Sequence, residues 1–340
     1  MADTFHFPVI NLLVPKTLTL GRVRFRPKGW LLAVLEADPR ADDDVPGWAE
    51  LHQELKGQAA ELKSSTADVE AQDEYKARDL VSDSIAALRL YQRLRYPMLN
   101  VDFQTFGLAA EMHASREAYW QTAEGVLTAA SGSWHGVFGE WTFTEPDVDA
   151  SKTDPAFIDL SKLLTVEPSS ANELDRRLLT ALRLLNRATV MLPPGLRVVQ
   201  LATALEALLG DRPQGERTHR IALRAAFLTC VFDERHHGLE RTCPYFGCWT
   251  IDALETGMKR AAAAGRVQFC SAYWNVRELQ DVRNSVLHDA VTEIERPQDA
   301  EGQVDNVLTQ LLRWRRGGPD RDTLTDLDRD IQTAAASWPN

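Results

Sequence analysis

Arginine, asparagine and histidine side chains occur together near the end of one predicted helix, and their chemistry suits the cleavage of RNA. The spacing of apolar residues from about Tyr273 onward predicts this helix. On it, Asn284 and His288 lie one turn apart on one face, and the long side chain of Arg283 can swing toward them. The sequence therefore places a guanidinium, an amide and an imidazole on the polar side of a helix.

RNA is cleaved when its 2′-hydroxyl attacks the neighbouring phosphate. This attack needs a base for the hydroxyl proton, an acid for the leaving oxygen and positive charge on the developing phosphorane. Histidine side chains can act as acid or base near neutral pH. Arginine stays charged and forms paired hydrogen bonds with phosphate oxygens. The three side chains thus predict cleavage without a metal ion. Spacing alone also allows a purely structural role on a solvated helix face.

The segment from Arg283 to His288 resembles the Arg-x4-6-His motif of HEPN-domain ribonucleases, with Asn284 at the polar position after the arginine. Upstream, residues 204–209 and 220–226 resemble the two earlier helices of the ApeA-like HEPN group, in the same order and at a similar separation. The resemblance covers about residues 172–316, under half of the chain. Asp289 departs from the family pattern, because glycine is expected after the histidine, and it adds a negative charge beside the motif.

The resemblance implies an all-α HEPN-like bundle that acts as a metal-independent endoribonuclease and needs no cofactor. Arg283 would stabilise the phosphorane, His288 would be the acid or base, and Asn284 would position one of them. The resemblance also implies a homodimer through the C-terminal domain, with two motifs facing one shared cleft. The expected role is antiviral defence by abortive infection, or toxin-like growth arrest, in a prokaryote.

Two alternatives stay open at this point. A non-catalytic HEPN-like module would bind RNA or a protein partner, and both Asp289 and the acidic balance of the chain favour it. A toxin silenced by an antitoxin partner is the other alternative. The sequence does not distinguish an inhibitory or sensor partner from an N-terminal domain that inhibits its own nuclease. It also does not give the RNA substrate or the trigger.

Glu206 lies in an otherwise apolar helical segment, where a buried carboxylate needs a partner. Arg224, between Leu223 and Ala225, is a candidate for that partner. The pair is expected to hold two helices in register behind the catalytic residues, with direct RNA contacts or no mutual contact as alternatives.

A second group of residues has ligand chemistry. His236, His237, Cys243 and Cys248 fall within thirteen residues and could bind zinc, although their spacing is not a standard double Cys-x2-Cys. The alternative is a loop that happens to be rich in histidine and cysteine. The chain has no Gly-x4-Gly-Lys loop, no Gly-x-Ser-x-Gly elbow and no His-Glu-x-x-His helix, so ATPase, hydrolase and metalloprotease functions lack support.

Composition limits the class of protein. The 340 residues suffice for two domains, and 44% of them are hydrophobic, which is typical of a globular chain. The sequence has no membrane-length apolar run and no secretory signal, and its four cysteines do not suggest a disulfide framework, so we expect a cytoplasmic protein without membrane contact. The net charge of −11 argues against indiscriminate nucleic-acid binding. Residues 172–316 nevertheless carry 20 basic against 18 acidic side chains, a net charge of +2.

The predicted organisation is an α+β domain over residues 1–150 that regulates or targets, a HEPN-like helical domain over residues 151–316, and an acidic, helical tail over residues 317–340. A stretch rich in proline and aspartate at 145–154 is the predicted boundary. Strands are expected at 9–14, 18–25 (with a bulge at Gly21), 99–103 and 141–143, and a fully buried strand at 30–35. Residues 36–79 are expected to form a loop and a helix entry, before a helix from about Val69 to Arg95.

The second half is predicted to be almost wholly helical, because leucines and other apolar residues recur there every three or four positions. Prolines and glycines set the expected ends. The expected helices lie at about 174–192, 196–209, 217–232, 250–264, 273–288, 303–314 and 320–336. In the motif helix, the apolar stripe is formed by Val276, Leu279, Val282 and Val286.

Overall fold

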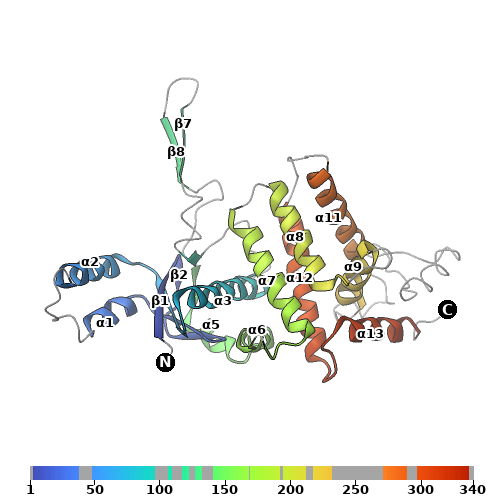
Figure 1. Cartoon of the computed structure of the whole chain (residues 1–340), viewed down its shortest axis with the longest axis horizontal. Helices are drawn as coiled ribbons and strands as arrows, with labels where there is room; N and C mark the ends of the chain where they lie inside the picture. The colour runs from blue at the N-terminus through green and yellow to red at the C-terminus, as the bar shows by residue number, and fades with distance from the viewer. Residues whose placement is uncertain are drawn as a thin grey trace. The chain divides into compact units, whose positions relative to one another are not determined.

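A computed structural model describes residues 3–37, 48–95, 106–108, 117–121, 127–131, 141–167, 169–191, 194–211, 217–231, 271–288 and 297–336. The chain divides into two compact units, residues 1–165 and 166–340 (Figure 1). The first unit has an antiparallel sheet with helices and the second is helical, so the chain is mixed α+β as predicted. The expected break at residues 145–154 contains helix α5 (Glu145–Ser151), which begins with a capping box formed by Thr144 and Asp147.

The central sheet of the first unit has five strands in the order β3-β4-β5-β1-β6. All of its neighbouring pairs are antiparallel. The strands are β1 (Asp3–Ile10), β3 (Leu18–Leu20), β4 (Val23–Arg26), β5 (Ser65–Ala71) and β6 (Gly107–Leu108). Two smaller pairs accompany it: β2 (Leu12–Leu13) runs parallel to β9 (Trp141–Thr142), and β7 (Glu117–Gln121) pairs with β8 (Leu127–Ser131).

Gly21 forms a tight turn and not the predicted bulge. Leu20 pairs with Val23, so Gly21 and Arg22 make a two-residue hairpin loop between β3 and β4. Gly21 has φ 62, which suits the first position of a type II′ turn. A Cβ at this position would also lie 2.5 Å from Leu164 Cβ, so the close approach of the neighbouring helix excludes a larger residue.

The stretch at residues 30–35 is helical, which corrects the prediction of a buried strand. Helix α1 (Trp30–Glu36) follows Gly29, whose φ of 83 is left-handed, and none of the helix residues is buried. Arg26 lies over the Trp30 ring at 4.3 Å from its centroid. A short apolar run has no periodicity that separates strand from helix, and this explains the error.

The polar stretch at residues 36–79 contains helix α2 (Trp48–Glu61) and the central strand β5, which the sequence did not predict. The buried carboxylate of Asp68 on this strand lies 2.8 Å from His6 Nδ1 and accepts a hydrogen bond of 2.7 Å from Arg26 Nε. Burial raises the pKa of Asp68, but the hydrogen bonds and charges of His6 and Arg26 outweigh it and lower that pKa below its ordinary value. Polar partners therefore make a polar strand stable in the middle of the sheet.

Helix α3 (Glu74–Arg95) packs on the sheet, and helix α6 (Pro155–Thr165) packs on α3 and β3. Val81, Ile85, Leu88 and Tyr91 of α3 are buried, as the apolar pattern predicted. The helix starts after β5 at Glu74 and not near Val69, because Val69 belongs to the strand.

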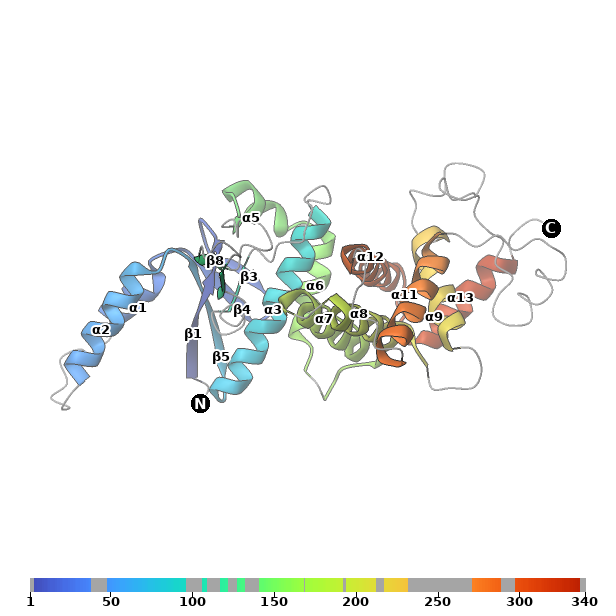
Figure 2. The ribbon, with the colours of Figure 1, turned by 90° about the horizontal axis from the view of Figure 1, so that it is seen from above.

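The second unit consists of helices in the described residues (Figures 1 and 2). Helix α7 packs along α8, helix α11 contacts α8 and α9, and α12 contacts α7, α8 and α11. Their leucines form the core, including the predicted Leu174, Leu178, Leu182 and Leu185. The elements are α7 (Glu173–Met191), α8 (Pro194–Leu209), α9 (Arg217–Ala226), a π-helical turn η4 (Phe227–Val231), α11 (Ser271–His288), α12 (Pro297–Arg316) and α13 (Leu324–Ala336).

Three expectations fall outside the described residues: the strand at 99–103, the helix at 250–264 and the zinc ligands His236, His237, Cys243 and Cys248. Within the residues that the structure describes, no helix is both long and apolar enough to cross a bilayer.

Candidate functional site

Helix α11 presents Arg283 on its packed side. Tyr273, Val276, Leu279 and Gln280 are buried where this helix meets α8 and α9. Arg283 follows Val276 by seven residues and Gln280 by three, so it continues this buried stripe. Val282 and Val286, which were expected in the stripe, are only half-buried. The guanidinium is thus held by helix packing and does not extend from the open polar face.

Glu206 of α8 is the partner of Arg283. Arg283 Nη1 lies 3.1 Å from Glu206 Oε1, and the two side chains are 28% and 13% exposed. Arg217, the first residue of α9, places its Nη2 3.4 Å from Glu206 Oε2 and is 49% exposed. One carboxylate therefore lies between two guanidinium groups, and the three side chains carry a net charge of +1. Such a partly exposed positive group can bind a phosphate oxygen.

The contacts of Arg283 leave hydrogen-bonding capacity. Its Nη1 donates to Asn284 Oδ1 over 3.5 Å, which is a long and weak bond. Its Nε is buried and has no hydrogen-bond partner among the residues that the structure describes. A buried donor without a partner is unfavourable by about 1–3 kcal/mol. The enclosed Nε is out of reach of a ligand, and a phosphate oxygen would meet Arg283 at its exposed part.

His288 is the last residue of α11 and is exposed. It lies five positions after Arg283, a rise of about 7.5 Å along the helix. The structure thus brings Arg283 and Asn284 together and places the imidazole beyond them at the helix end. Asp289 lies outside the described residues.

Arg224 is not the partner of Glu206, which corrects the predicted pairing. It is 1% exposed and donates to Asp328 over 2.7 Å and 2.5 Å, to Asp211 over 3.0 Å and to the Leu209 carbonyl over 2.6 Å. Burial lowers the pKa of Arg224, but the hydrogen bonds and charges of Asp328 and Asp211 outweigh it and raise that pKa. Arg224 therefore ties α9 to α13 and to the end of α8, and it is too enclosed for RNA contact.

A second polar group, formed by side chains of α9 and α11, was not predicted from the sequence. His219 Nδ1 of α9 lies 2.6 Å from the Tyr273 hydroxyl of α11, and their rings meet edge to face at 5.6 Å. Arg277 Nη1 donates to the same hydroxyl over 3.4 Å. His219 and Tyr273 are buried, so this group fixes the position of α11 relative to α9. One signal in the sequence could have indicated the part of this group that lies on α11. Polar side chains recur there at helical spacing, at Tyr273, Arg277, Asn284 and His288.

Arg217 is the other residue that sequence reasoning missed. No motif in the sequence marks Arg217. The packing of α9 against α8 brings its guanidinium to the Glu206 carboxylate. In the part of the chain that the structure describes, no three His, Cys, Asp or Glu side chains are arranged to hold a metal ion.

Comparison of the chain with protein-family models, with curated proteins and with solved structures gives no match.

Proposed function

We propose that this protein is a metal-independent endoribonuclease of the HEPN type, with its active site at Arg283, Asn284 and His288 in the second unit. The observation that supports this best is the position of Arg283. Its guanidinium is oriented by Glu206 at 3.1 Å and remains 28% exposed, on a helix that ends in an exposed histidine. Orientation together with access to solvent is what a phosphate-binding arginine needs.

In this mechanism Arg283 binds the phosphate that becomes the phosphorane, and Arg217 adds a second positive charge beside it. His288 removes or returns a proton, and Asn284 orients Arg283 through its amide oxygen. The nucleophile is the substrate's 2′-hydroxyl, so the 5′ product ends in a 2′,3′-cyclic phosphate. A net charge of only +1 at the three side chains favours contact with one or two phosphates over a long RNA backbone.

One copy of the site supplies one histidine, whereas cyclisation needs both an acid and a base. A homodimer through the second unit would supply two imidazoles to one cleft. We place the function in prokaryotic antiviral defence or toxin-like growth arrest in the cytoplasm, with the first unit, or a separate inhibitory or sensor partner, controlling the nuclease.

A second candidate is a non-catalytic HEPN-like module that binds RNA or a protein. The ion pair between Arg283 and Glu206 favours it, because a paired arginine has less charge to offer a phosphorane. The rise of about 7.5 Å between Arg283 and His288 favours it as well, since one phosphate must reach both side chains.

The deciding experiment uses one synthetic RNA in excess EDTA, with and without a single deoxyribose on the 5′ side of the cleaved bond. Wild-type protein should cut the all-ribose RNA and leave a cyclic phosphate, and the deoxy substitution should stop cleavage at that bond only. Arg283→Ala and His288→Ala should each lower the rate by ~10²-fold or more, as for other lost electrostatic or acid–base groups. Arg187→Ala, on an exposed position of α7, is the matched control and should cut normally.

Two results would reject the proposal. Cleavage of the deoxy RNA at the same bond would mean that water is the nucleophile. Loss of all activity in EDTA would mean that a metal ion takes part. RNA binding without cleavage, unchanged by EDTA, would instead support the non-catalytic module.

A further inference from the structure

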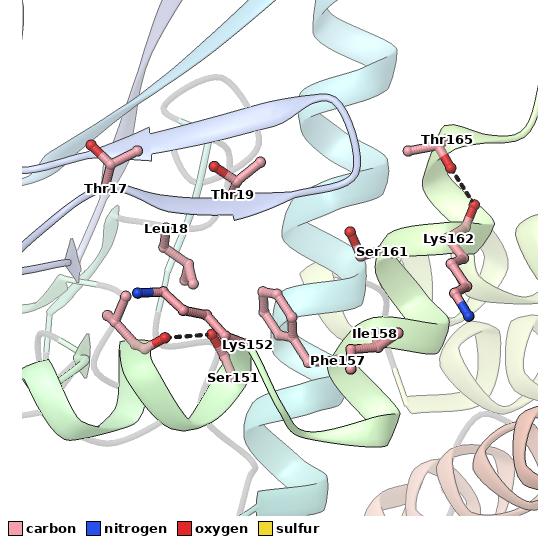
Figure 3. A pocket seen from close by; sticks show the side chains of 11 residues that line it. Thr17, Leu18, Thr19, Ser151, Lys152, Phe157, Ile158, Ser161, Lys162 and Thr165 are labelled. Atoms are coloured by element: carbon pink, nitrogen blue, oxygen red, sulfur yellow. Dashed lines mark hydrogen bonds between the residues drawn. The ribbon is translucent and has the colours of Figure 1, made fainter.

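A cavity of about 400 Å³ lies in the first unit between strand β3 and helices α5 and α6 (Figure 3). Its floor is apolar: Leu18, Val148 and Phe157 are buried there, and Ile158 is half-buried. Figure 3 shows Leu18 and Phe157 directed into the gap between the strand and the helices. A cavity of this size and lining can hold one or two apolar side chains of a ligand.

The strand beside the cavity is an edge of the five-stranded sheet. Strand β3 pairs with β4 on one side, and Leu20 and Val23 close the hairpin as a hydrogen-bonded pair. Because hydrogen-bonded and non-bonded pairs alternate along an antiparallel ladder, the N–H and C=O of Thr19 point away from β4. Neither group has a hydrogen-bond partner among the described residues. These groups are a template for another strand.

The edge is open over a limited length. Two residues after Thr19, the Gly21 N–H donates to Ser161 Oγ of α6 over 3.0 Å. Arg22 Nη2 donates to the Thr165 carbonyl over 3.2 Å. Helix α6 thus closes one end of the edge and leaves Thr19 beside the cavity. A strand that pairs at Thr19 would place alternate side chains over the apolar floor.

Lysine side chains beside the cavity outnumber the carboxylate that they share. Among the eleven lining residues, two are lysines and none is acidic. Lys152 extends along the underside of β3 near Leu18, whereas Lys162 points away from the cavity (Figure 3). The neighbouring carboxylate of Asp149 lies 2.9 Å from Lys152 Nζ and 2.7 Å from Lys16 Nζ, so one acid is shared by two lysines. Exposed pairs of this kind are weak, and Lys152 can exchange its partner for an acidic ligand.

We propose that this groove binds an extended acidic peptide segment of a partner protein, which adds a strand to β3 at Thr19. An apolar side chain of the peptide fills the space above Leu18 and Phe157, and a carboxylate two residues further along the peptide, on the same face of the added strand, pairs with Lys152. Backbone hydrogen bonds supply affinity and the cavity supplies selectivity, as in other cases of strand addition. This inference is independent of RNA cleavage.

The test uses the full chain and a fluorescein-labelled peptide of about seven residues. Valine and glutamate take turns at every second position of this peptide, with threonine between them, so that both kinds of side chain lie on one face of the strand. A second peptide has lysine in place of glutamate. Fluorescence anisotropy should show binding of the acidic peptide and none of the basic one. Thr19→Pro removes the outward N–H without removing a ladder hydrogen bond, because proline is tolerated on edge strands when its N–H side faces solvent. It should weaken binding ~10-fold, the equivalent of one lost hydrogen bond. Thr19→Val keeps the N–H and should bind as the wild type does.

A second variant, Lys152→Glu, should fold as the wild type does, because the Lys152 side chain is 66% exposed. It should also lower peptide affinity ~10-fold by replacing attraction with repulsion. Lys76→Glu, at another exposed position of the same unit, should have no effect. Hydrogen exchange should show protection of the Thr19 amide when the acidic peptide is present.

Absence of binding by the acidic peptide would overturn the proposal. Equal affinity in Thr19→Pro and Thr19→Val, without protection of the Thr19 amide, would overturn it too, because the peptide would then not pair with β3. Binding that is lost in Lys152→Glu but unchanged in Thr19→Pro would indicate a site for a small organic anion in place of a strand.

Discussion

Arg283 of α11 and Glu206 of α8 form an ion pair of 3.1 Å, and Arg217 of α9 shares the same carboxylate at 3.4 Å. One glutamate thus connects three helices at the position where the motif residues lie. Its carboxylate orients Arg283 and at the same time cancels part of the positive charge that a phosphate would meet. Substitutions of Glu206 and Arg217 separate these two effects.

Glu206→Gln keeps the shape of the side chain and removes its charge. We expect kcat for RNA cleavage to fall ~10- to 100-fold because Arg283 loses its fixed position, while KM does not rise because the site becomes more positive. The free energy of unfolding should fall by no more than about 1 kcal/mol, since the ion pairs are partly exposed. Steady-state kinetics and chemical denaturation of the same samples measure both. An increase in kcat would show that Glu206 inhibits Arg283 and does not position it.

Arg217→Ala should raise KM and leave kcat nearly unchanged, because Arg217 is 49% exposed and adds charge without a fixed orientation. The slope of log affinity against log salt for single-stranded RNA should fall by ~0.7, the value for one phosphate contact. Binding titrations at several salt concentrations measure this slope, with Arg187→Ala as the control. An unchanged slope would remove Arg217 from the RNA-binding surface.

Arg224→Met should destabilise the protein by about 3–5 kcal/mol, because it removes the buried counter-charge of Asp328 and leaves Asp211 with Arg220 alone. The loss should appear in denaturant midpoints of the second unit. A milder variant, Asp328→Asn, should cost less and should leave RNA cleavage intact in the folded fraction. If Arg224→Met were as stable as the wild type and inactive, Arg224 would belong to the RNA site after all.

Asp211 predicts a dependence of stability on pH. Burial raises its pKa, but the charge of Arg224 and hydrogen bonds from Arg220 and Arg224 outweigh burial and lower the pKa below its ordinary value. The ionised carboxylate therefore stabilises the fold above the unfolded-state pKa of about 4, and this contribution is lost as the pH falls through the folded-state pKa. Asp211→Asn should be less stable at pH 7 by about 1–3 kcal/mol and should lose less further stability on acidification. Denaturation at pH 7 and pH 3 tests this, and parallel losses in both proteins would contradict it.

The proposed homodimer predicts an effect of substituting Leu287, which is 51% exposed and directly precedes His288. Leu287→Glu should convert the dimer to a monomer and abolish cleavage at the concentrations where wild-type protein is active, because a charge replaces apolar surface at the interface. Sedimentation velocity measures the mass. Leu55→Glu, at a 36% exposed leucine of the first unit, should stay dimeric. An active wild-type monomer would rule out a shared cleft.

Most of the described helices of the second unit were predictable from the sequence alone. Leu174, Leu178, Leu182 and Leu185 recur at helical spacing and are buried, and Gly210 follows the last residue of α8 as its position predicted. Such helices are predictable because their hydrogen bonds are local and one apolar stripe decides which side packs. The sequence also singled out Arg283, Asn284 and His288 for their chemistry, and Glu206 as a carboxylate that needs a partner.

The ion-pair partners of the charged residues, and the choice of which polar residues are buried, depend on the tertiary fold. The sequence does not predict strand β5 because Ser65, Thr66 and Asp68 are polar, and the burial of Asp68 is stable only with partners that are distant in sequence, His6 and Arg26. Glu206 was assigned to Arg224 but pairs with Arg283 and Arg217, while Arg224 binds Asp211 and Asp328. Arginine side chains are long, and several carboxylates compete for each of them. Helix packing settles that competition, because it fixes which charges meet and how far water is excluded from them.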